Sequence, residues 1–408
     1  MGPHPQPPGH QGEESVTFKG YRRPDGSFGV RNYLLVLPTV SCANKVVYGI
    51  KALLPEVVAL PHPYGCTFDV EEAERFLRVL EGFGTHPNVA AVVLVSLGCE
   101  TTPVGEVYDA VRRSGRPVAL VEVQREGGVR RAIGKGLEYA RKFLEGMEEK
   151  VREEAPLSEL TVALECGGSD SYSGISANPA VGAFSDLLVS EGGTVVLSET
   201  SELVGAEHVL AERAVGPEVR EALLRTVRRA ERELALSSPD AGGLYLAPGN
   251  VEGGLTTIEE KSLGCAYKAG TSPVVEVVEY AQRPSRRRGV VVMDTPGYDV
   301  ASITGMVAGG AQVVVFTTGR GTPTGCPIAP VLRVCSNTST FSRLSEDMDV
   351  NAGTIVDGKE GIEEVGKRIF REVLRVASGG RTKAEHWPYQ EFAVARTSWI
   401  ERKVLCEG

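Results

Sequence analysis

The chain has 408 residues, of which 42% are apolar and 24% charged, a composition that excludes a disordered protein. Its 53 acidic and 44 basic residues give a net charge of −9, which favours neither nucleic acid nor an anionic membrane as a partner. The sequence contains no apolar run of transmembrane length, and its start lacks the features of a signal peptide. We therefore expect a cytoplasmic protein with reduced cysteines and with no membrane or nucleic-acid partner.

The first part of the chain predicts one folded domain behind a short leader. Residues 1–17 are polar and rich in Pro and Gly, and we expect a disordered leader there. Between residues 18 and 155, short apolar runs alternate with segments of helical spacing, which is typical of a doubly wound α/β domain. The expected strands are 33–37, 57–60, 90–97 and 118–121, and the expected helices are 42–54, 70–80, 103–113 and 129–149.

The charged stretch 150–159 predicts a domain boundary. Residues 156–408 repeat the alternation and predict a second α/β domain, which we expect to be the catalytic one. Its strands are expected at 160–164, 193–197, 289–293, 311–316 and 331–334, and its helices at 180–188, 217–236 and 363–376. The predicted fold is thus two α/β domains with largely parallel sheets and long Gly-rich active-site loops, since loops of this length inside a compact fold are usually functional.

Four unusual loops follow expected strands. Parallel sheets bind ligands at the carboxyl ends of their strands, so a shared placement of such loops indicates a site. The loops are residues 62–66 (HPYGC), 98–100 (GCE), 166–170 (CGGSD) and 317–321 (TTGRG).

Several of these segments contain metal-ligating side chains. His62 and Cys66 are potential donors, although a capping histidine and a buried cysteine explain them equally well. His208 follows Glu199 and Glu202, and imidazole with carboxylates can bind one divalent ion; Glu202 alone also suits a helix start. The eight cysteines include no CxxC pair, which disfavours a structural zinc site. Buried inert thiols, metal ligands and, less favoured, an iron–sulfur cluster remain open.

Other segments are suited to holding an anionic substrate. The loop 166–170 precedes a helix, whose free N–H groups can bind a carboxylate; a long helix cap is the alternative. Arg320 lies in a Gly-rich loop that lacks the Walker spacing, and it can still form a bidentate pair with a carboxylate. The segment 249–262 contains many polar residues and reads either as a solvated helix start or as the source of an acid and a base.

Taken in order, a set of segments between about Lys19 and about Gly358 carries a family resemblance. They read GYRRPDGSFGVRNYLLVLPTVSCAN, LPHPYGC, LGCE, CGGSDSYSGISANPAVG, EGGTVVLSETSELVGAEHVL, GNVEGGLTTIEEKSLG, DTPGYD, FTTGRGTPTG and DMDVNAG. In this order they resemble the altronate/galactarate dehydratase family, which also contains the large subunit of sulfolactate sulfo-lyase.

The resemblance implies a hydro-lyase that depends on ferrous iron or manganese and removes water from a sugar acid to give a 2-keto-3-deoxy acid. Loss of sulfite from sulfolactate is the same elimination with another leaving group, so a sulfo-lyase is the second hypothesis. A non-catalytic subunit that binds sugar acids is the third. Full-length members carry a small N-terminal domain, and only about 18 residues precede GYRRPDG here. We expect either a separate small subunit or a branch that works without one, and an oligomeric protein.

Such an elimination needs a base for the proton beside the carboxylate and an acid for the departing hydroxide. On the resemblance, His62 and His208 are the expected metal ligands, with Cys66, Glu199 or Glu202 completing the set. Lys261 is the expected base, since burial can tune a lysine towards neutral pH, and His208 and Glu260 are further catalytic candidates. The expected substrate-binding residues are Gly167, Gly168, Ser169, Asp170, Asn250, Thr256, Thr257 and Arg320.

Overall fold

The computed structural model describes residues 16–237, 246–285, 288–387 and 391–395. The leader predicted for residues 1–17 therefore lies almost wholly outside the described residues, and Thr17 already begins a strand. None of the described helices combines the length and the apolar character that crossing a membrane requires.

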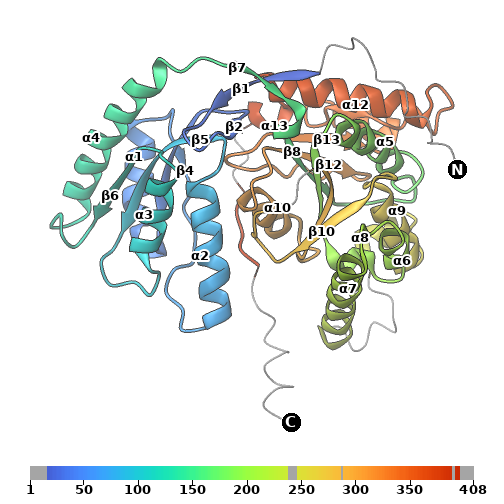
Figure 1. Cartoon of the computed structure of the whole chain (residues 1–408), viewed down its shortest axis with the longest axis horizontal. Coiled ribbons are helices and arrows are strands. Elements are labelled where there is room, and N and C mark those ends of the chain that lie inside the picture. Colours follow the sequence, from blue (N-terminus) through green and yellow to red (C-terminus); the bar gives the residue numbers. More distant parts are fainter. Residues whose placement is uncertain (1–15, 238–245, 286–287, 388–390, 396–408) are drawn as a thin grey trace, which may run out of the picture.

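A four-stranded parallel sheet forms the first domain, in the order β4-β3-β5-β6. Helices α1 and α4 cover one face, and α2 and α3 cover the other (Figure 1). Burial on both faces explains why the strands read as unbroken apolar runs rather than as alternating ones. The elements are β3 (Tyr33–Pro38), α1 (Asn44–Leu53), β4 (Val58–Ala59), α2 (Val70–Gly84), β5 (Val89–Ser96), α3 (Val104–Arg113), β6 (Val118–Glu122) and α4 (Val129–Glu148).

A seven-stranded parallel sheet forms the second domain, in the order β10-β11-β9-β8-β12-β13-β14. Its strands are β8 (Thr161–Cys166), β9 (Thr194–Leu197), β10 (Val274–Val278), β11 (Gly289–Met293), β12 (Val313–Thr318), β13 (Val331–Cys335) and β14 (Val350–Asn351). The chain adds strands first to one side of β8 and later to the other. The carboxyl end of β8 is thus the point where the strand order reverses, which is where open α/β sheets bind ligands.

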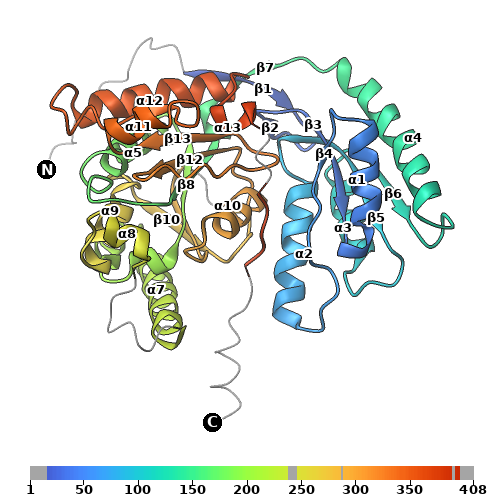
Figure 2. The same cartoon turned by 180° about the vertical axis from the view of Figure 1, so that it is seen from behind.

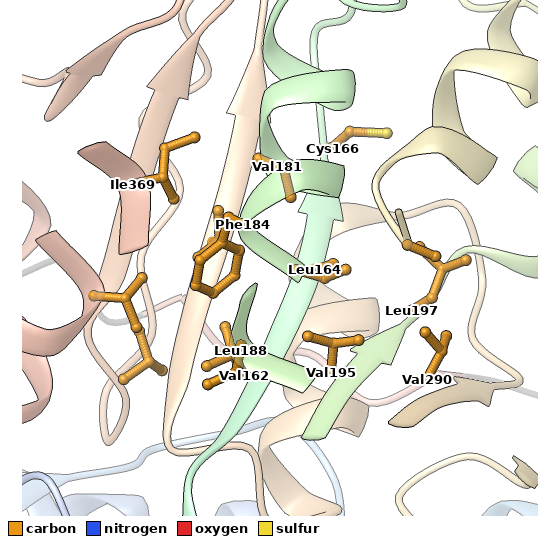
Figure 3. Close-up of a cluster of buried hydrophobic side chains, with 14 of the residues drawn as sticks. Val162, Leu164, Cys166, Val181, Phe184, Leu188, Val195, Leu197, Val290 and Ile369 are labelled. Atoms are coloured by element: carbon orange, nitrogen blue, oxygen red, sulfur yellow. The ribbon is translucent and has the colours of Figure 1, made fainter. Parts of the chain in front are cut away.

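Helices cover both faces of this sheet. The helices α5 (Ala177–Ser190) and α12 (Ile362–Ala377) pack on one face, where Figure 3 shows Phe184 and Ile369 in the same apolar cluster as Val162 and Leu164 of β8. Helix α10 (Asp299–Ala308) packs on the other face and also contacts α2, which joins the two domains (Figures 1 and 2).

The remaining elements surround the carboxyl edge or link the domains. A small antiparallel sheet, β2-β1-β7, was not predicted, and it places a strand within the charged stretch 150–159. The predicted α/β class with largely parallel sheets is confirmed. The further elements are β1 (Thr17–Arg22), β2 (Phe28–Gly29), β7 (Glu153–Pro156), α6 (Glu207–Ala211), α7 (Pro217–Ser237), α8 (Pro248–Glu252), α9 (Ile258–Tyr267), α11 (Thr338–Arg343) and α13 (Lys383–His386), with short 3₁₀ turns at Ser41–Ala43, Leu157–Glu159 and Thr200–Leu203.

A buried histidine ties the first domain to the start of β12. The Nε2 of His86 lies 3.0 Å from the carbonyl of Ala311, and its Nδ1 accepts a hydrogen bond from the N–H of Asn88 at 3.0 Å. Asn88 in turn donates to the carbonyls of Gln312 and Ile328. Both ring nitrogens are therefore used by a neutral imidazole, and burial lowers the pKa of His86 to about 3.

We expect the protein to lose stability as the pH falls from about 6.5 towards 3, because the unfolded chain protonates His86 and the folded chain does not. Above that window both states are neutral, so this residue adds no pH dependence. In His86→Gln the side chain cannot be protonated but can still donate to Ala311. Urea unfolding midpoints at several pH values across this window should therefore vary less in His86→Gln than in the parent, and equal slopes would contradict this account.

Candidate active site

A cavity of about 660 Å³ opens at the carboxyl ends of the central strands of the larger sheet. Its walls come from the loop after β8, the turn after β9, helices α8, α9 and α10, and the loop after β12. Polar side chains from six separate segments reach it: Cys166, Glu202, Asn250, Lys261, Asp299 and Arg320. This convergence at the switch point makes the cavity the candidate active site.

The loops after β8 and β12 are joined along their backbones. The carbonyl of Gly168 accepts hydrogen bonds from the N–H groups of Gly319 and Arg320, at 3.1 and 2.9 Å. A Cβ atom on Gly167 would lie 2.0 Å from Oδ2 of Asp299, so only glycine allows that carboxyl group to lie against the strand end. The guanidinium of Arg320 donates to Glu252 of α8 at 3.0 Å at the edge of the cavity.

Four buried side chains form what we call the Cys/Glu cluster: Cys166, Glu199, Glu202 and Cys265. One ligand atom of each lies within 4.8 Å of the others. The N–H of Cys166 donates to Oε2 of Glu199 at 3.0 Å, and its Sγ–H donates to Oε2 of Glu202 at 3.1 Å. Two thiols and two carboxylates at this spacing are a potential site for one metal ion.

A tight turn after β9 carries the two carboxylates of the cluster. Glu199 has a positive φ of 60°, a conformation that costs free energy in a residue other than glycine, and its N–H donates to Oγ1 of Thr295 at 2.7 Å. The next turn of backbone is closed by a bond from the N–H of Glu202 to the carbonyl of Glu199 at 2.7 Å. The strained residue therefore aims both side chains inward from one short segment.

Two lysines face these carboxylates: Lys261 lies in helix α9, and Lys268 directly follows it. Lys268 forms an ion pair with Glu199 at 3.0 Å, with both side chains fully buried, and Lys261 pairs with Glu202. Burial alone would lower the pKa of each lysine, but the negative groups around them outweigh burial, and both pKa values rise. The expectation that Lys261 is tuned towards neutral pH is therefore wrong, because its ammonium is paired with Glu202 rather than only desolvated.

A second acidic group adjoins the cluster. Glu165, Glu199 and Asp299 place one carboxyl oxygen each within 4.8 Å. Oε2 of Glu165 accepts hydrogen bonds from the hydroxyls of Ser198 and Ser302, at 2.8 and 2.7 Å, whereas its Oε1 and that of Glu199 are buried without a donor. Burial and the charge of Glu199 raise the pKa of Glu165, so a retained proton on Glu165 can bridge these two oxygens.

Two family models match most of the chain, one described as "D-galactarate/Altronate dehydratase, C-terminal" over residues 157–400 and one as "D-galactarate dehydratase/Altronate hydrolase, second domain" over residues 20–148. Altronate dehydratase of Bacillus subtilis is 34% identical over 395 residues, which cover 94% of this chain and 78% of that protein. Galactarate dehydratase (L-threo-forming) of Escherichia coli is 38% identical over 407 residues, 94% of this chain and 76% of that protein. The chain belongs to the D-galactarate/altronate dehydratase family. The resemblance carried by the sequence motifs is thereby confirmed.

A further member of the D-galactarate/altronate dehydratase family has a different name. The (2R)-sulfolactate sulfo-lyase subunit beta of Chromohalobacter salexigens is 36% identical over 382 residues, which cover 93% of this chain and 97% of that protein. The family therefore spans two kinds of leaving group, and membership alone does not decide between them.

In this family member the cavity gathers only part of the residues predicted from sequence. Glu199 and Glu202 lie in the Cys/Glu cluster, whereas Ser169 and Asp170 lie just behind the cavity. Asp170 accepts from the side chains of Ser173, Ser336 and Asn337, and Asn250 donates to the carbonyl of Ser169. The predicted residues that line the cavity are Gly167, Gly168, Glu202, Asn250, Lys261 and Arg320.

The histidines expected as metal ligands do not join the cluster. Nε2 of His62 donates to the carbonyl of Pro38 at 2.7 Å, and its Nδ1 accepts from the N–H of Tyr64 at 3.2 Å, so neither nitrogen has a free lone pair for a metal. Burial lowers the pKa of His62 to about 4. Cys66 is exposed on the loop after β4, and His208 is exposed on α6. Neither of the two potential metal-binding groups among the described residues includes any of the three.

Glu260 and its neighbours form a helix cap rather than part of the cavity wall. Oε2 of Glu260 accepts from the N–H and hydroxyl of Thr256, and Oγ1 of Thr257 accepts from the N–H of Glu260. This reciprocal pattern satisfies free donors at the start of α9. It corresponds to the solvated helix start that the sequence left open as an alternative.

Four residues at the centre of the site were not among the predicted site residues: Glu165, Cys265, Lys268 and Asp299, although the cysteines as a group had been left open as metal ligands. Lys261, Cys265 and Lys268 are spaced i, i+4 and i+7, which puts them on one face of a helix, so this pattern could have revealed two of the four. Asp299 begins α10 in the DTPGYD segment, and its pKa rises to about 7 because of burial and the nearby charge of Glu199. Glu165 is the penultimate residue of β8 and is fully buried, which its sequence does not indicate.

Proposed function

We propose that this chain is the catalytic subunit of a metal-dependent dehydratase that converts a sugar acid of the altronate or galactarate type to a 2-keto-3-deoxy acid. The observation that carries the proposal is the buried Cys/Glu cluster, two of whose members, Cys166 and Glu202, line a cavity of about 660 Å³. Two relatives named altronate dehydratase and galactarate dehydratase, each aligned over 94% of the chain, support the choice of reaction.

The chemistry of the cluster fits a divalent metal ion. Oε1 of Glu199 is buried without a fixed donor, and loss of the proton that it can share with Glu165 would free it as a ligand. Coordination deprotonates thiols, so two thiolates and a dication would leave the charge balance of the two carboxylates and two lysines unchanged. Thiolates suit iron better than manganese, which prefers oxygen ligands, so of the two expected metals we propose ferrous iron. The residues that would hold it are Cys166, Glu199, Glu202 and Cys265.

A divalent ion bound there would act as a Lewis acid that stabilises the negative charge developing on the substrate. The carboxyl group of Asp299 lines the cavity, and its pKa of about 7 makes it a stronger base than an ordinary aspartate. We propose that Asp299 is the base that removes the proton from the carbon next to the substrate carboxylate. The Nζ of Lys261 remains protonated at neutral pH through its pairing with Glu202. We propose that Lys261 is the acid that donates a proton to the departing hydroxyl group.

Arg320 is the proposed anchor for the substrate carboxylate. It lies after the end of β12, on a loop whose backbone is held by Gly168. Among the described residues its ion-pair partner is the exposed Glu252, which a substrate carboxylate can replace. We expect Arg320→Ala to raise KM by about 10- to 100-fold with a smaller effect on kcat, since a charge-assisted hydrogen bond contributes roughly 1.5–3 kcal/mol. Steady-state kinetics measure this, with Arg371→Ala, an exposed position on α12, as the control. An unchanged KM would exclude Arg320 as the anchor.

The sulfo-lyase alternative is supported by a specific observation. The relative named sulfolactate sulfo-lyase subunit beta aligns over 97% of its own length, a more complete match than the dehydratases provide. This relative is named as one subunit of its enzyme, which also supports our proposal that a small partner subunit assembles with this chain in an oligomer. The same base and acid would serve sulfite loss, because only the leaving group differs.

One assay separates the two functions. The purified chain, loaded anaerobically with ferrous iron, is offered altronate, galactarate and sulfolactate, with and without a candidate small subunit, and both 2-keto acid and sulfite are measured. The proposal predicts a 2-keto acid from a sugar acid and no sulfite. Sulfite from sulfolactate would establish the sulfo-lyase instead, and silence under every condition would favour a non-catalytic binding subunit.

A further inference from the structure

Three free cysteines of the first domain are exposed: Cys42, Cys66 and Cys99. Cysteine is among the most buried residue types, so three exposed thiols in one small domain are unusual. Each follows a strand, namely β3, β4 and β5, and these strands are neighbours in the sheet order β4-β3-β5. The three thiols therefore leave the same carboxyl edge on adjacent loops, away from the Cys/Glu cluster in the other sheet.

Hydrogen bonds fix these three loops to one another. The N–H of Ser41 donates to the carbonyl of Tyr64 at 2.8 Å, which joins the Cys42 loop to the Cys66 loop. The N–H of Thr67 donates to Oγ1 of Thr101 at 3.0 Å, which joins the Cys66 loop to the Cys99 loop. The Cys42 and Cys99 loops are joined by a bond of 2.6 Å from Oγ1 of Thr39 to Oε1 of Glu100. Each cysteine is thus next in sequence to a residue that forms a hydrogen bond with the loop of another of these cysteines.

His62, which was expected to be a metal ligand, and Gly65 support this arrangement. His62 holds the Cys66 loop against the end of β3 through its bond to Pro38, and its carbonyl accepts from Asn44 of α1 at 2.8 Å. A Cβ atom on Gly65 would lie 2.2 Å from the carbonyl of Thr39, and Gly65 has a positive φ of 103°, so only glycine lets the loops approach this closely. The close packing positions Cys66 relative to Cys42.

One of the three sulfurs already has a polar neighbour suited to a thiolate. The Nε2 of Gln124, from the segment after β6, donates to Sγ of Cys99 at 3.4 Å. Hydrogen bonds to ligating sulfurs tune the centres that thiolates hold. The carboxylate of Glu100 is held by Thr39 and by the N–H groups of Leu97 and Gly98, so it is engaged with the loop backbone rather than with a ligand.

The spacing of the thiols selects the kind of centre. Two sulfur ligands of one zinc ion, with bonds of about 2.3 Å, lie within about 4.6 Å of each other. Among the described residues, neither group of three or more ligand atoms within 4.8 Å of one another contains any of these thiols. In a [4Fe–4S] cluster each cysteine binds a different iron atom, so the thiols stand further apart than in a single-metal site.

We propose that Cys42, Cys66 and Cys99 bind an iron–sulfur cluster of the [4Fe–4S] type at the carboxyl edge of the four-stranded sheet. No fourth cysteine among the described residues follows a strand of this sheet, so these thiols leave one iron free for a non-protein ligand. This site is separate from the ferrous ion proposed for the Cys/Glu cluster and does not depend on it.

The test is anaerobic reconstitution of the full chain with ferric iron, sulfide and dithiothreitol, in which the thiol reduces part of the iron, followed by measurement of iron, acid-labile sulfide and visible absorption. We expect about four sulfides per chain and a broad absorption band, both lost in each of Cys42→Ser, Cys66→Ser and Cys99→Ser. The matched control is Cys326→Ser, a partly buried cysteine of the other domain, which should keep the full sulfide content. Far-UV circular dichroism of every variant verifies that the fold is retained.

Two further variants separate this proposal from the dehydratase site. Glu202→Gln should lose the additional ferrous ion and keep the labile sulfide. Cys265→Ala should also keep the labile sulfide. The proposal is overturned if iron binds without labile sulfide, if the sulfide is lost in Cys265→Ala instead, or if the three serine variants retain the cluster.

Discussion

Replacing Glu202 by glutamine is expected to lower kcat/KM by at least about 10³-fold and to abolish binding of one divalent ion per chain. Glu202 supplies a carboxylate of the Cys/Glu cluster, accepts from the thiol of Cys166 and pairs with Lys261. Glutamine preserves the shape but removes the charge, so it weakens metal binding and leaves Lys261 without its partner. The loss should therefore be larger than removal of a single hydrogen bond produces.

The matched control for that variant is Glu259→Gln, an exposed glutamate on the first turn of α9. Metal content by elemental analysis and kinetics of 2-keto acid formation are measured on both variants. Unfolding in urea verifies that the Glu202→Gln protein is folded. A folded Glu202→Gln protein that keeps its metal and its activity would rule out the cluster as the catalytic centre.

Lys268→Met is expected to destabilise the metal-free protein by about 3–5 kcal/mol, because it leaves the fully buried Glu199 without its cation. Burial raises the pKa of Glu199, and the two lysines lower it to below its usual range, so the carboxylate is ionised in the intact protein. Without Lys268 the fold must either keep an unpaired charge or protonate it.

A double variant tests whether this loss is a matter of charge. Lys268→Met combined with Glu199→Gln removes both members of the pair, and we expect it to recover most of the lost stability. Urea unfolding of the single and double variants at neutral pH gives the coupling free energy. Additive losses in the double variant would show that the two side chains do not stabilise each other.

The parallel sheets could be predicted because their strands are buried on both faces. The expected strand at 289–293 is observed with the same bounds, and the strand expected at 90–97 is observed at Val89–Ser96. The antiparallel strands β1 and β7 were missed because they carry charged and small residues in short alternation, which resembles a linker. Helix α10 was missed because it is buried on nearly all sides and shows no amphipathic spacing.

The site was predicted less well than the fold, for a physical reason. Sequence identifies side chains that can ligate a metal, but it does not show which of them are already hydrogen-bonded. His62 is a strong donor by type, and the carbonyl of Pro38 and the N–H of Tyr64 occupy both of its nitrogens. Lys268 and Glu165 read as ordinary residues, and only the fold makes them fully buried and places them beside Glu199.

The most direct test of the account is anomalous diffraction at the iron edge from crystals loaded anaerobically with ferrous iron. We predict an iron peak among Cys166, Glu199, Glu202 and Cys265, beside the cavity that Cys166 and Glu202 line, and its loss in crystals of Glu202→Gln. An iron-loaded, active crystal with no peak at this position would contradict the central claim that dehydration takes place at the Cys/Glu cluster.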